Sequence, residues 1–402
     1  MLLKSVLKQI IELQQIFYLQ HSDGMKRKTL SSLKSIKTHA HIISGIRRCG
    51  KSTLLLQQMN KNYKDAFFIN FDDPRIADFD KFDWIKLDEI IRETNQKVLF
   101  FDEIQIIDEW EKYVRQKLDE SYKIYITGSN ASLLSRELGT KLTGRHIGYE
   151  LFPFSYVEYI TFKNLENSVE SLSNYMNDGG FPEYLKTGEK EILLQLFNDI
   201  LIRDISVRYG IRDYKTLQRL ALFLISNIGN RITGTALKKQ FGFGSTVTVL
   251  EYLSHLETSY LFFFIHRFSY SLKSQSINPR KVYSIDNGMI QINSISFTDD
   301  IGQKFENLVF LHLRRKYSEI FYFSENKECD FIVFENGKPI ELVQVCYMLN
   351  NDNFERETSG LFEAMDFFKL PFGTIVTLNQ NDNFVEKNKT INVIEAHKYF
   401  TK

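Results

Sequence analysis

The chain has 402 residues, which is long for a single domain and suggests about two or three. Hydrophobic residues make up 43% of it, so packed cores can form and wholesale disorder is excluded. Lysine and arginine number 51 against 50 acidic residues, and the resulting net charge of +1 excludes a global electrostatic attraction to nucleic acid. Nucleic-acid binding would therefore need a local basic patch.

The first predicted element is an amphipathic helix over residues 1–19. Charged residues interrupt its apolar pattern, which argues against a signal peptide. No uncharged run approaches the roughly 20 residues needed to span a bilayer, so we expect no membrane partner. The cysteines form no Cys-x-x-Cys pair, which argues against a disulfide framework or structural zinc and favours a cytoplasmic location. They are Cys49, Cys329 and Cys346.

A complete GxxxxGK[ST] motif spans residues 45–52, between a predicted strand over 38–45 and a predicted helix over 51–61. Glycines let backbone N–H groups turn inward around phosphate oxygens, Lys51 reaches the β- and γ-phosphates, and Ser52 holds Mg²⁺. The N-terminus of the following helix also favours anions. The motif predicts ATP binding; the alternative is a tight turn without a ligand. The predicted nucleotide-binding residues are Gly45, Ile46, Arg47, Arg48, Cys49, Gly50, Lys51, Ser52 and Thr53.

The next informative strand covers residues 98–101, a continuously apolar run typical of a strand buried on both faces. Asp102 and Glu103 follow it, at the carboxyl end where ligands bind in open α/β sheets. We predict that Asp102 ligates Mg²⁺, directly or through water, and that Glu103 is the base that orients the attacking water. The alternative is a solvated strand end.

A further buried strand, over residues 122–130, ends in Ser129 and Asn130, either of which is placed to contact the γ-phosphate or the water. The alternative is an ordinary exit from a strand into a turn. Arg145 follows a helical stretch at 130–138. We predict that it enters the nucleotide site of a neighbouring subunit in a homo-oligomer, where it stabilises transition-state charge.

Four stretches in this order, GIRRCGKS, FFDEIQ, ITGSNASLLS and LTGR, resemble the prokaryotic AAA+ ATPases that carry a C-terminal domain of unknown function. NFDDPR at 70–75, GGFPEYL at 179–185 and KVYSIDNGMI at 281–290 extend the resemblance over nearly the whole chain. It implies a nucleotide-dependent oligomeric or conformational machine. It also implies that Ser129 and Asn130 form sensor 1, that Arg145 is a finger, and that Arg203 is a sensor-2-like arginine. For Arg203 the alternative is a salt bridge on a helix surface.

Residues 211–295 show the order helix, turn, helix, apolar strand, which is that of a winged helix. The second helix carries no lysine or arginine, so a scaffold or protein-binding role stays open beside DNA binding. Basic residues lie before that helix and in the expected wing: Lys238, Lys239, Lys273, Arg280 and Lys281.

The C-terminal third resembles the PD-(D/E)xK nuclease fold in its order of helix, strand, hairpin, helix and strand. Glu306 and Asp330 match its helix acid and first strand acid. Where that chemistry needs a second strand acid and a lysine, the chain has Gln344 and Cys346. We therefore predict a nuclease-like architecture with a degraded site, retained for binding or assembly.

The predicted fold is a parallel AAA+ sheet flanked by helices (1–160), a helical connector (161–210), a winged-helix-like module (211–295) and an α/β nuclease-like domain (296–402). The predicted function is Mg²⁺-dependent ATP hydrolysis coupled to conformational change; whether DNA or a protein is the partner stays open. One alternative is a nucleic-acid-binding adapter switched by ATP with little turnover. The other is a metal-dependent nuclease.

Overall fold

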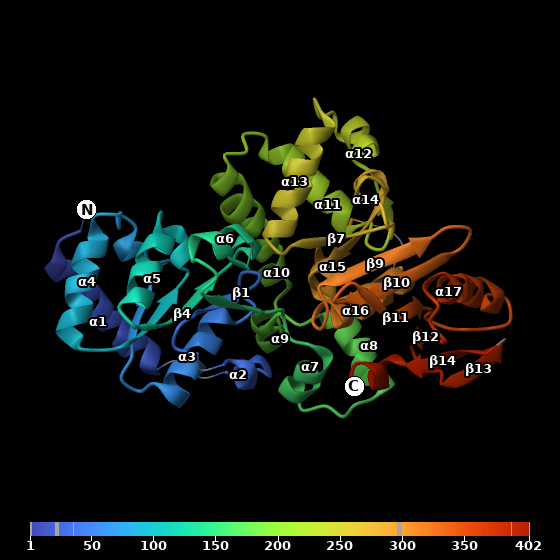
Figure 1. Ribbon diagram of the computed structural model, residues 1–402, viewed down its shortest axis with the longest axis horizontal. Coiled ribbons are helices and arrows are strands. Elements are labelled where there is room, and N and C mark those ends of the chain that lie inside the picture. Colours follow the sequence, from blue (N-terminus) through green and yellow to red (C-terminus); the bar gives the residue numbers. More distant parts are fainter. Residues whose placement is uncertain are drawn as a thin grey trace. The chain divides into compact units, whose positions relative to one another are not determined.

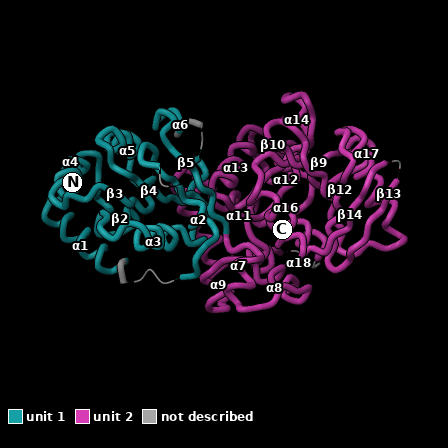
Figure 2. The backbone as a smooth tube through the Cα atoms, turned by 60° about the horizontal axis from the view of Figure 1, so that its bottom comes forward, with its two compact units in different colours: residues 1–152 teal, residues 153–402 magenta. Residues whose placement is uncertain are grey.

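The computed structural model describes residues 2–20, 24–34, 36–134, 136–295, 300–386 and 388–401. The chain divides into two compact units, Met1–Phe152 and Pro153–Lys402 (Figure 2).

The first unit is built on a five-stranded sheet in the order β2-β3-β4-β1-β5. Figure 1 labels two of its strands, β1 and β4. All four strand pairs are parallel, so the carboxyl ends of the strands meet at one edge. The strands are β1 (Ala40–Ser44), β2 (Phe67–Asn70), β3 (Val98–Asp102), β4 (Lys123–Gly128) and β5 (His146–Glu150). The helices are α1 (Lys4–Gln20), α2 (Thr29–Ser32), α3 (Lys51–Asn62), α4 (Asp83–Thr94), α5 (Trp110–Asp119) and α6 (Arg136–Lys141), with short 3-10 turns η1 (Pro74–Ile76), η2 (Ile104–Ile106) and η3 (Ala131–Leu134).

Both faces of this sheet are covered, as the continuous apolar runs of β1, β3 and β4 require. Because side chains alternate along a strand, Leu99 and Phe101 face a core shared with α1, α4 and α5. Phe100 points the other way and stacks on Tyr125, whose hydroxyl accepts a hydrogen bond from Gln58 of α3. The predicted parallel sheet flanked by helices is thus confirmed.

The second unit begins with helices and continues into a small sheet. The helices are α7 (Tyr156–Lys163), α8 (Val169–Asp178), α9 (Pro182–Thr187), α10 (Lys190–Asp199) and the π-helix η4 (Ile200–Val207). Then follow α11 (Tyr214–Ile225), β6 (Arg231–Ile232), α12 (Gly234–Phe241), α13 (Thr246–Thr258), β7 (Phe262–His266), α14 (Leu272–Ile277), β8 (Arg280–Ser284) and α15 (Asn287–Asn293). The antiparallel sheet β6-β8-β7 closes this part, which has the element order expected from the sequence.

The last part of the second unit holds a six-stranded sheet in the order β13-β14-β12-β11-β10-β9. β9, β10 and β11 are antiparallel, whereas β12 runs parallel to β11 and β14. The elements are α16 (Ile301–Arg314), β9 (Glu319–Ser324), β10 (Glu328–Glu335), β11 (Lys338–Val345), α17 (Phe354–Phe368), β12 (Phe372–Thr377), β13 (Asp382–Glu386), β14 (Lys389–Glu395) and α18 (Ala396–Tyr399). The predicted order of helix, strand, hairpin, helix and strand is present.

Two stretches that carried the family resemblance meet inside the second unit. The buried Asp286 accepts hydrogen bonds from the backbone N–H groups of Gly180, at 2.6 Å, and Met289, at 3.1 Å. Gly179 has φ of 69°, and a Cβ there would lie 2.1 Å from an oxygen of Asp286. These residues fasten α15 to the turn before α9, so both stretches serve the packing of this unit.

Candidate nucleotide-binding site

The loop at 45–52 connects β1 to α3, at the carboxyl edge of the first sheet. A Cβ on Gly45 would lie 2.0 Å from the backbone oxygen of Leu151, so only glycine fits. Gly50 precedes α3 with φ of 100°, a left-handed conformation that glycine adopts without strain. The glycines of the motif are thus required by the backbone itself, and they leave the amino end of α3 facing the loop.

Lys51 lies buried against the acid that follows β3. Its Nζ atom donates to the carbonyl of Ile46 at 3.1 Å and lies 3.4 Å from Oε1 of Glu103. Burial is the largest single effect and lowers the pKa of Lys51, but the neighbouring groups together, Glu103 first among them, outweigh burial, so the pKa is raised overall. Burial raises the pKa of Glu103, but Lys51 and other donors outweigh it, so that pKa is lowered overall. Both groups are therefore charged near neutral pH, and they form an ion pair.

Asp102 ends β3 and is 1% exposed. Its carboxylate accepts a hydrogen bond from the hydroxyl of Thr127, and the hydroxyl of Ser52 lies near enough to lower its pKa. Burial and the neighbouring Glu103 carboxylate raise the pKa of Asp102 to about 6, against the effect of these two hydroxyl donors. A carboxylate and a nearby hydroxyl supply the hard oxygen ligands that Mg²⁺ takes in nucleotide sites. The predicted metal pair, Ser52 and Asp102, is brought together.

Gln105 links the predicted base to the predicted sensor. Its Nε2 atom donates to Oε2 of Glu103 at 2.6 Å and to Oγ of Ser129 at 3.4 Å. The side chain of Asn130 instead accepts from the backbone N–H of Ser132 at 2.8 Å and caps the turn after β4. No role was predicted for Gln105 or Thr127 from the sequence, although both lie inside the stretches FFDEIQ and ITGSNASLLS.

The two arginines and the cysteine inside the loop have different surroundings. Nη1 of Arg47 lies 3.6 Å from Oδ2 of Asp72, just beyond β2. Arg48 has φ of 62°. The thiol of Cys49 is buried, donates to the carbonyl of Leu151 at 3.3 Å, and has a pKa raised by burial. Cys49 is therefore protonated and serves as a small residue that fills space in the loop.

Arg27, for which no role was predicted from the sequence, holds the loop in place through hydrogen bonds to backbone carbonyls. Its side chain is 6% exposed. It donates to the carbonyl of Cys49 at 2.8 Å and to that of Phe152 at 2.7 Å. No local motif marks an arginine so far before the loop.

Arg145 lies at the opposite edge of the sheet from the loop. It directly precedes β5, and its carbonyl accepts from the N–H of Ala40, the first residue of β1. Its guanidinium pairs with Asp119 at 2.8 Å and is 30% exposed. The four steps along β1 to Ser44 separate it from the loop by about 13 Å. Arg145 therefore does not serve the site of its own subunit in this arrangement.

Arg203 lies on η4, in the second unit, and its side chain is exposed. It makes no ion pair with any residue in the part of the chain that the structure describes.

The predicted C-terminal acids also converge, but on a lysine. Nζ of Lys281, from β8, lies 3.0 Å from Glu306, 2.7 Å from Glu328 and 2.9 Å from Asp330. Lys281 is 4% exposed, so it is not part of a basic surface. The prediction that Lys281 contributes to a basic wing is therefore wrong. Within the described ranges, no cluster of histidine, cysteine, aspartate or glutamate has a geometry that could hold a metal ion.

Gln344 and Cys346 stand where a nuclease would have its second acid and its lysine. The Gln344 amide accepts from the N–H of Asp330 at 3.2 Å and donates to Glu357 at 2.8 Å. Burial raises the pKa of Cys346 to about 11, so this thiol is neutral. Lys281, which reaches Asp330 from 49 residues earlier in the chain, was missed because no local pattern connects the two.

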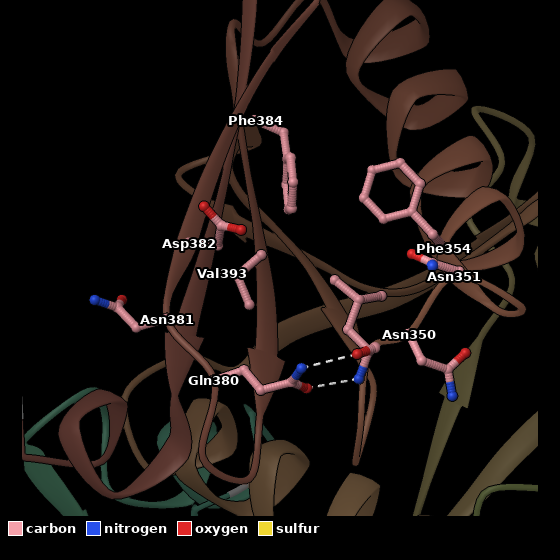
Figure 3. Close-up of a pocket in the computed structure, with 9 residues that line it drawn as sticks. Asn350, Asn351, Phe354, Gln380, Asn381, Asp382, Phe384 and Val393 are labelled. Carbon is pink, nitrogen blue, oxygen red and sulfur yellow. Dashed lines mark hydrogen bonds between the residues drawn. The ribbon is translucent and has the colours of Figure 1, made fainter.

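A pocket of about 600 Å³ opens beside the loop after β11 (Figure 3). Gln380 holds its base through hydrogen bonds of 2.7 and 2.8 Å to the backbone of Leu349. Its lining includes Phe354, Phe384 and Asp382, and none of the lining residues is basic. The pocket therefore offers no cation for a phosphate.

The parallel sheet, the glycine loop at its carboxyl edge and the adjoining acid define an AAA+ P-loop ATPase fold. The family described as "AAA domain" matches residues 37–160, and that described as "Domain of unknown function (DUF8612)" matches residues 169–296. "Uncharacterized protein MJ1544" of Methanocaldococcus jannaschii is 37% identical over 88% of this chain and 85% of its own length. An "Uncharacterized protein" of Haemophilus influenzae is 32% identical over 82% of this chain and 87% of its own length. The chain belongs to the family of these two proteins.

Among solved structures, AMPPCP-bound DnaA from Aquifex aeolicus matches 57% of this chain and 85% of its own, with 14% identity and a TM-score of 0.30. PCH-2 of C. elegans matches 43% of this chain and 49% of its own, with 12% identity and a TM-score of 0.24. Likenesses this low carry no argument. In the part of the chain that the structure describes, no helix is both long and apolar enough to cross a membrane.

Proposed function

We propose that this protein hydrolyses ATP with Mg²⁺ at the loop 45–52 and couples hydrolysis to a conformational change. The observation that supports this most strongly is the meeting of the loop with the acids after β3. Lys51 lies 3.4 Å from Glu103, and the hydroxyl of Ser52 lies near enough to Asp102 to lower the pKa of that carboxylate. A loop that cradled phosphate without hydrolysis would not need a second acid beside the metal ligand.

The residues present fit Mg²⁺, which would be held by Ser52 and Asp102 together with phosphate oxygens and water. When bound, the ion neutralises charge on the β- and γ-phosphates. The loop N–H groups and the amino end of α3 bind the same phosphates. When ATP binds, the ammonium of Lys51 moves from the carbonyl of Ile46 and the carboxylate of Glu103 to the phosphates. Glu103 then no longer has Lys51 as its ion-pair partner.

Glu103 then acts as the base. The oxygen of a water molecule attacks the γ-phosphorus, and the bond from that phosphorus to the bridging oxygen breaks, so ADP leaves with the electron pair. Glu103 accepts the proton from the water and passes it on to the phosphate product. Before ATP binds, Lys51 lowers the pKa of Glu103, so this carboxylate is already ionised when the nucleotide arrives. Gln105, through its 2.6 Å hydrogen bond, orients the carboxylate.

The test compares Glu103→Gln with Lys51→Ala in the full chain. Glu103→Gln is expected to lower phosphate release at least about 100-fold while ATP binding stays within about twofold of wild type. Lys51→Ala is expected to lose binding itself. Glu109→Gln, an exposed glutamate paired with Lys112, is the matched control. Wild-type turnover by Glu103→Gln would reject the assigned base.

The assembly part of this proposal rests on Arg145, which is partly exposed and remote from its own loop. In a homo-oligomer its guanidinium would reach the site of the next subunit, and Arg203 would act as the sensor-2-like arginine. Arg145→Ala should then lower turnover only in the assembled state, as measured by turnover against protein concentration.

For the C-terminal part we propose a nuclease-like domain that does not cleave. Lys281 neutralises Glu306 and Asp330, the carboxylates that would bind a metal. Gln344 and Cys346 supply neither the negative charge of the second strand acid nor the positive charge of the lysine that cleavage needs. Incubation of plasmid DNA with Mg²⁺ or Mn²⁺ should give no cleavage. Cleavage that Asp330→Asn abolishes would establish the nuclease alternative.

DNA binding by the winged-helix-like part is a second candidate function. The exposed side chain of Lys239, the half-buried Lys238 and the exposed Lys273 remain available around α12 and α14. Phosphate contacts make such binding fall steeply with salt. Replacing the three lysines with glutamine should abolish binding at low salt, while absence of binding by the wild type, with or without ATP, would end this candidate.

A further inference from the structure

Arg47 crosses the edge of the sheet on which the proposed hydrolysis takes place. The loop that carries Arg47 starts at the end of β1. Asp72, the ion-pair partner of Arg47, lies two residues beyond the last residue of β2. Two strands, β4 and β3, lie between β1 and β2. At about 4.8 Å between neighbouring strands, this is a span of about 14 Å, so the side chain has to reach along the carboxyl edge toward β3.

The guanidinium of Arg47 therefore lies on the side of the loop where β3 presents Glu103. Two cations, Arg47 and Lys51, reach toward this edge from one short loop, and each has a carboxylate within 4 Å. Burial has the largest effect on the pKa of Glu103 and raises it. Lys51 lowers this pKa most, and the positive charge of Arg47 lowers it further.

The ion pair between Arg47 and Asp72 is weak enough for Arg47 to exchange Asp72 for another anion. The side chain of Asp72 is 44% exposed and that of Arg47 is 20% exposed. An exposed ion pair contributes little free energy because water and salt screen it. A triphosphate carries several times the charge of one carboxylate and offers bidentate oxygens, which arginine prefers.

We propose that Arg47 is a catalytic residue that binds the γ-phosphate oxygens from within the same subunit. This inference rests on the proposed ATPase function and names a second source of positive charge for it. Arg47 leaves Asp72 when ATP binds, and stabilises the charge that builds on the γ-phosphate oxygens as the bond to ADP breaks. A subunit then carries this charge itself, whether or not Arg145 of a neighbour is present.

Arg27 and Arg145 do not have this placement. Arg27 donates to two backbone carbonyls and is 6% exposed, which is the environment of a structural clamp. Arg145 lies at the far edge of the sheet. Arg75 pairs with Asp73 at 2.7 Å, one residue after Asp72. It is an exposed arginine with an aspartate partner close by, which makes it the matched control.

The experiment measures ATP binding, ADP binding and phosphate release for wild type, Arg47→Ala, Arg47→Lys and Arg75→Ala, over a range of protein concentrations. Arg47→Ala is expected to weaken ATP binding about tenfold and to leave ADP binding within about twofold, because only ATP has the γ-phosphate. Turnover should fall by about 100-fold or more at every protein concentration, and Arg47→Lys should restore part of it. Arg75→Ala should match wild type. Asp72→Asn, which removes the resting partner, should strengthen ATP binding about twofold to threefold.

Equal losses of ATP and ADP binding in Arg47→Ala would overturn the inference, because Arg47 would then only support the loop. Wild-type turnover by Arg47→Ala would overturn it as well. If the wild type releases no phosphate, the proposed function fails, and the ATP-against-ADP comparison alone still decides whether Arg47 reads the γ-phosphate.

Discussion

Replacing Lys281 with methionine removes a buried cation that Glu306, Glu328 and Asp330 share in the second unit. The ammonium lies within 3.0 Å of Glu306, Glu328 and Asp330, and its side chain is 5% exposed. Removing one partner from a buried ion pair costs about 3–5 kcal/mol. The lower end applies here, because Glu328 keeps its ion pair with Arg231 and Asp330 keeps a backbone N–H donor at 3.0 Å. We expect a loss of about 3 kcal/mol at pH 8.

The location of the tryptophans allows this loss to be assigned to one unit. Both tryptophans, Trp84 and Trp110, lie in the first unit, so their fluorescence reports its unfolding alone. In urea titrations, Lys281→Met should shift the far-UV circular dichroism transition to lower urea and leave the fluorescence transition unchanged. Lys273→Met, an exposed lysine before β8, is the control. A loss below about 0.5 kcal/mol, or an equal shift of both transitions, would refute the idea of a charge-neutralised cluster.

Further predictions concern the same two sites. Burial raises the pKa of Glu306 from 4.5 to about 7 despite Lys281, so the folded state binds its proton more tightly than the unfolded state. The contribution of Glu306 to the wild-type stability should therefore be fully present below about pH 4.5 and be lost, by up to about 3 kcal/mol, as the pH rises through about 7, whereas Glu306→Gln should lack this component in urea titrations at each pH. Gln105→Ala, which frees the carboxylate of Glu103, should lower the turnover number about tenfold with ATP affinity unchanged; unchanged turnover would remove the positioning role. Gly45→Ala should destabilise the first unit by about 2 kcal/mol or more, seen by tryptophan fluorescence, because its Cβ would meet a backbone oxygen at 2.0 Å. Wild-type stability of that variant would show that the loop can shift.

The features that the sequence predicted well are those encoded by residues close together in the chain. A buried parallel strand shows as a continuous apolar run, and a phosphate loop has its own spacing, so β1, β3 and the loop between β1 and α3 could be located. Parallel pairing of β3 beside β4 then brings Asp102 to Thr127 without any further signal.

The features that the sequence did not predict depend on contacts between distant segments. Arg27 reaches the loop from a separate segment, and Lys281 reaches Asp330 from another sheet. A buried lysine and a surface lysine look alike in a sequence, because the difference lies in what packs over them. For that reason the pattern placed Lys281 in a basic wing, while the fold buries it among carboxylates.

The central claim is most directly tested by a crystal structure of the full chain with Mg²⁺ and a non-hydrolysable ATP analogue. We predict that the triphosphate lies along residues 45–52, that Nζ of Lys51 has moved from Glu103 to the phosphates, and that Ser52 and Asp102 are both within metal reach. A nucleotide bound elsewhere, or a Lys51 that still pairs with Glu103 at 3.4 Å beside a bound triphosphate, would contradict the account.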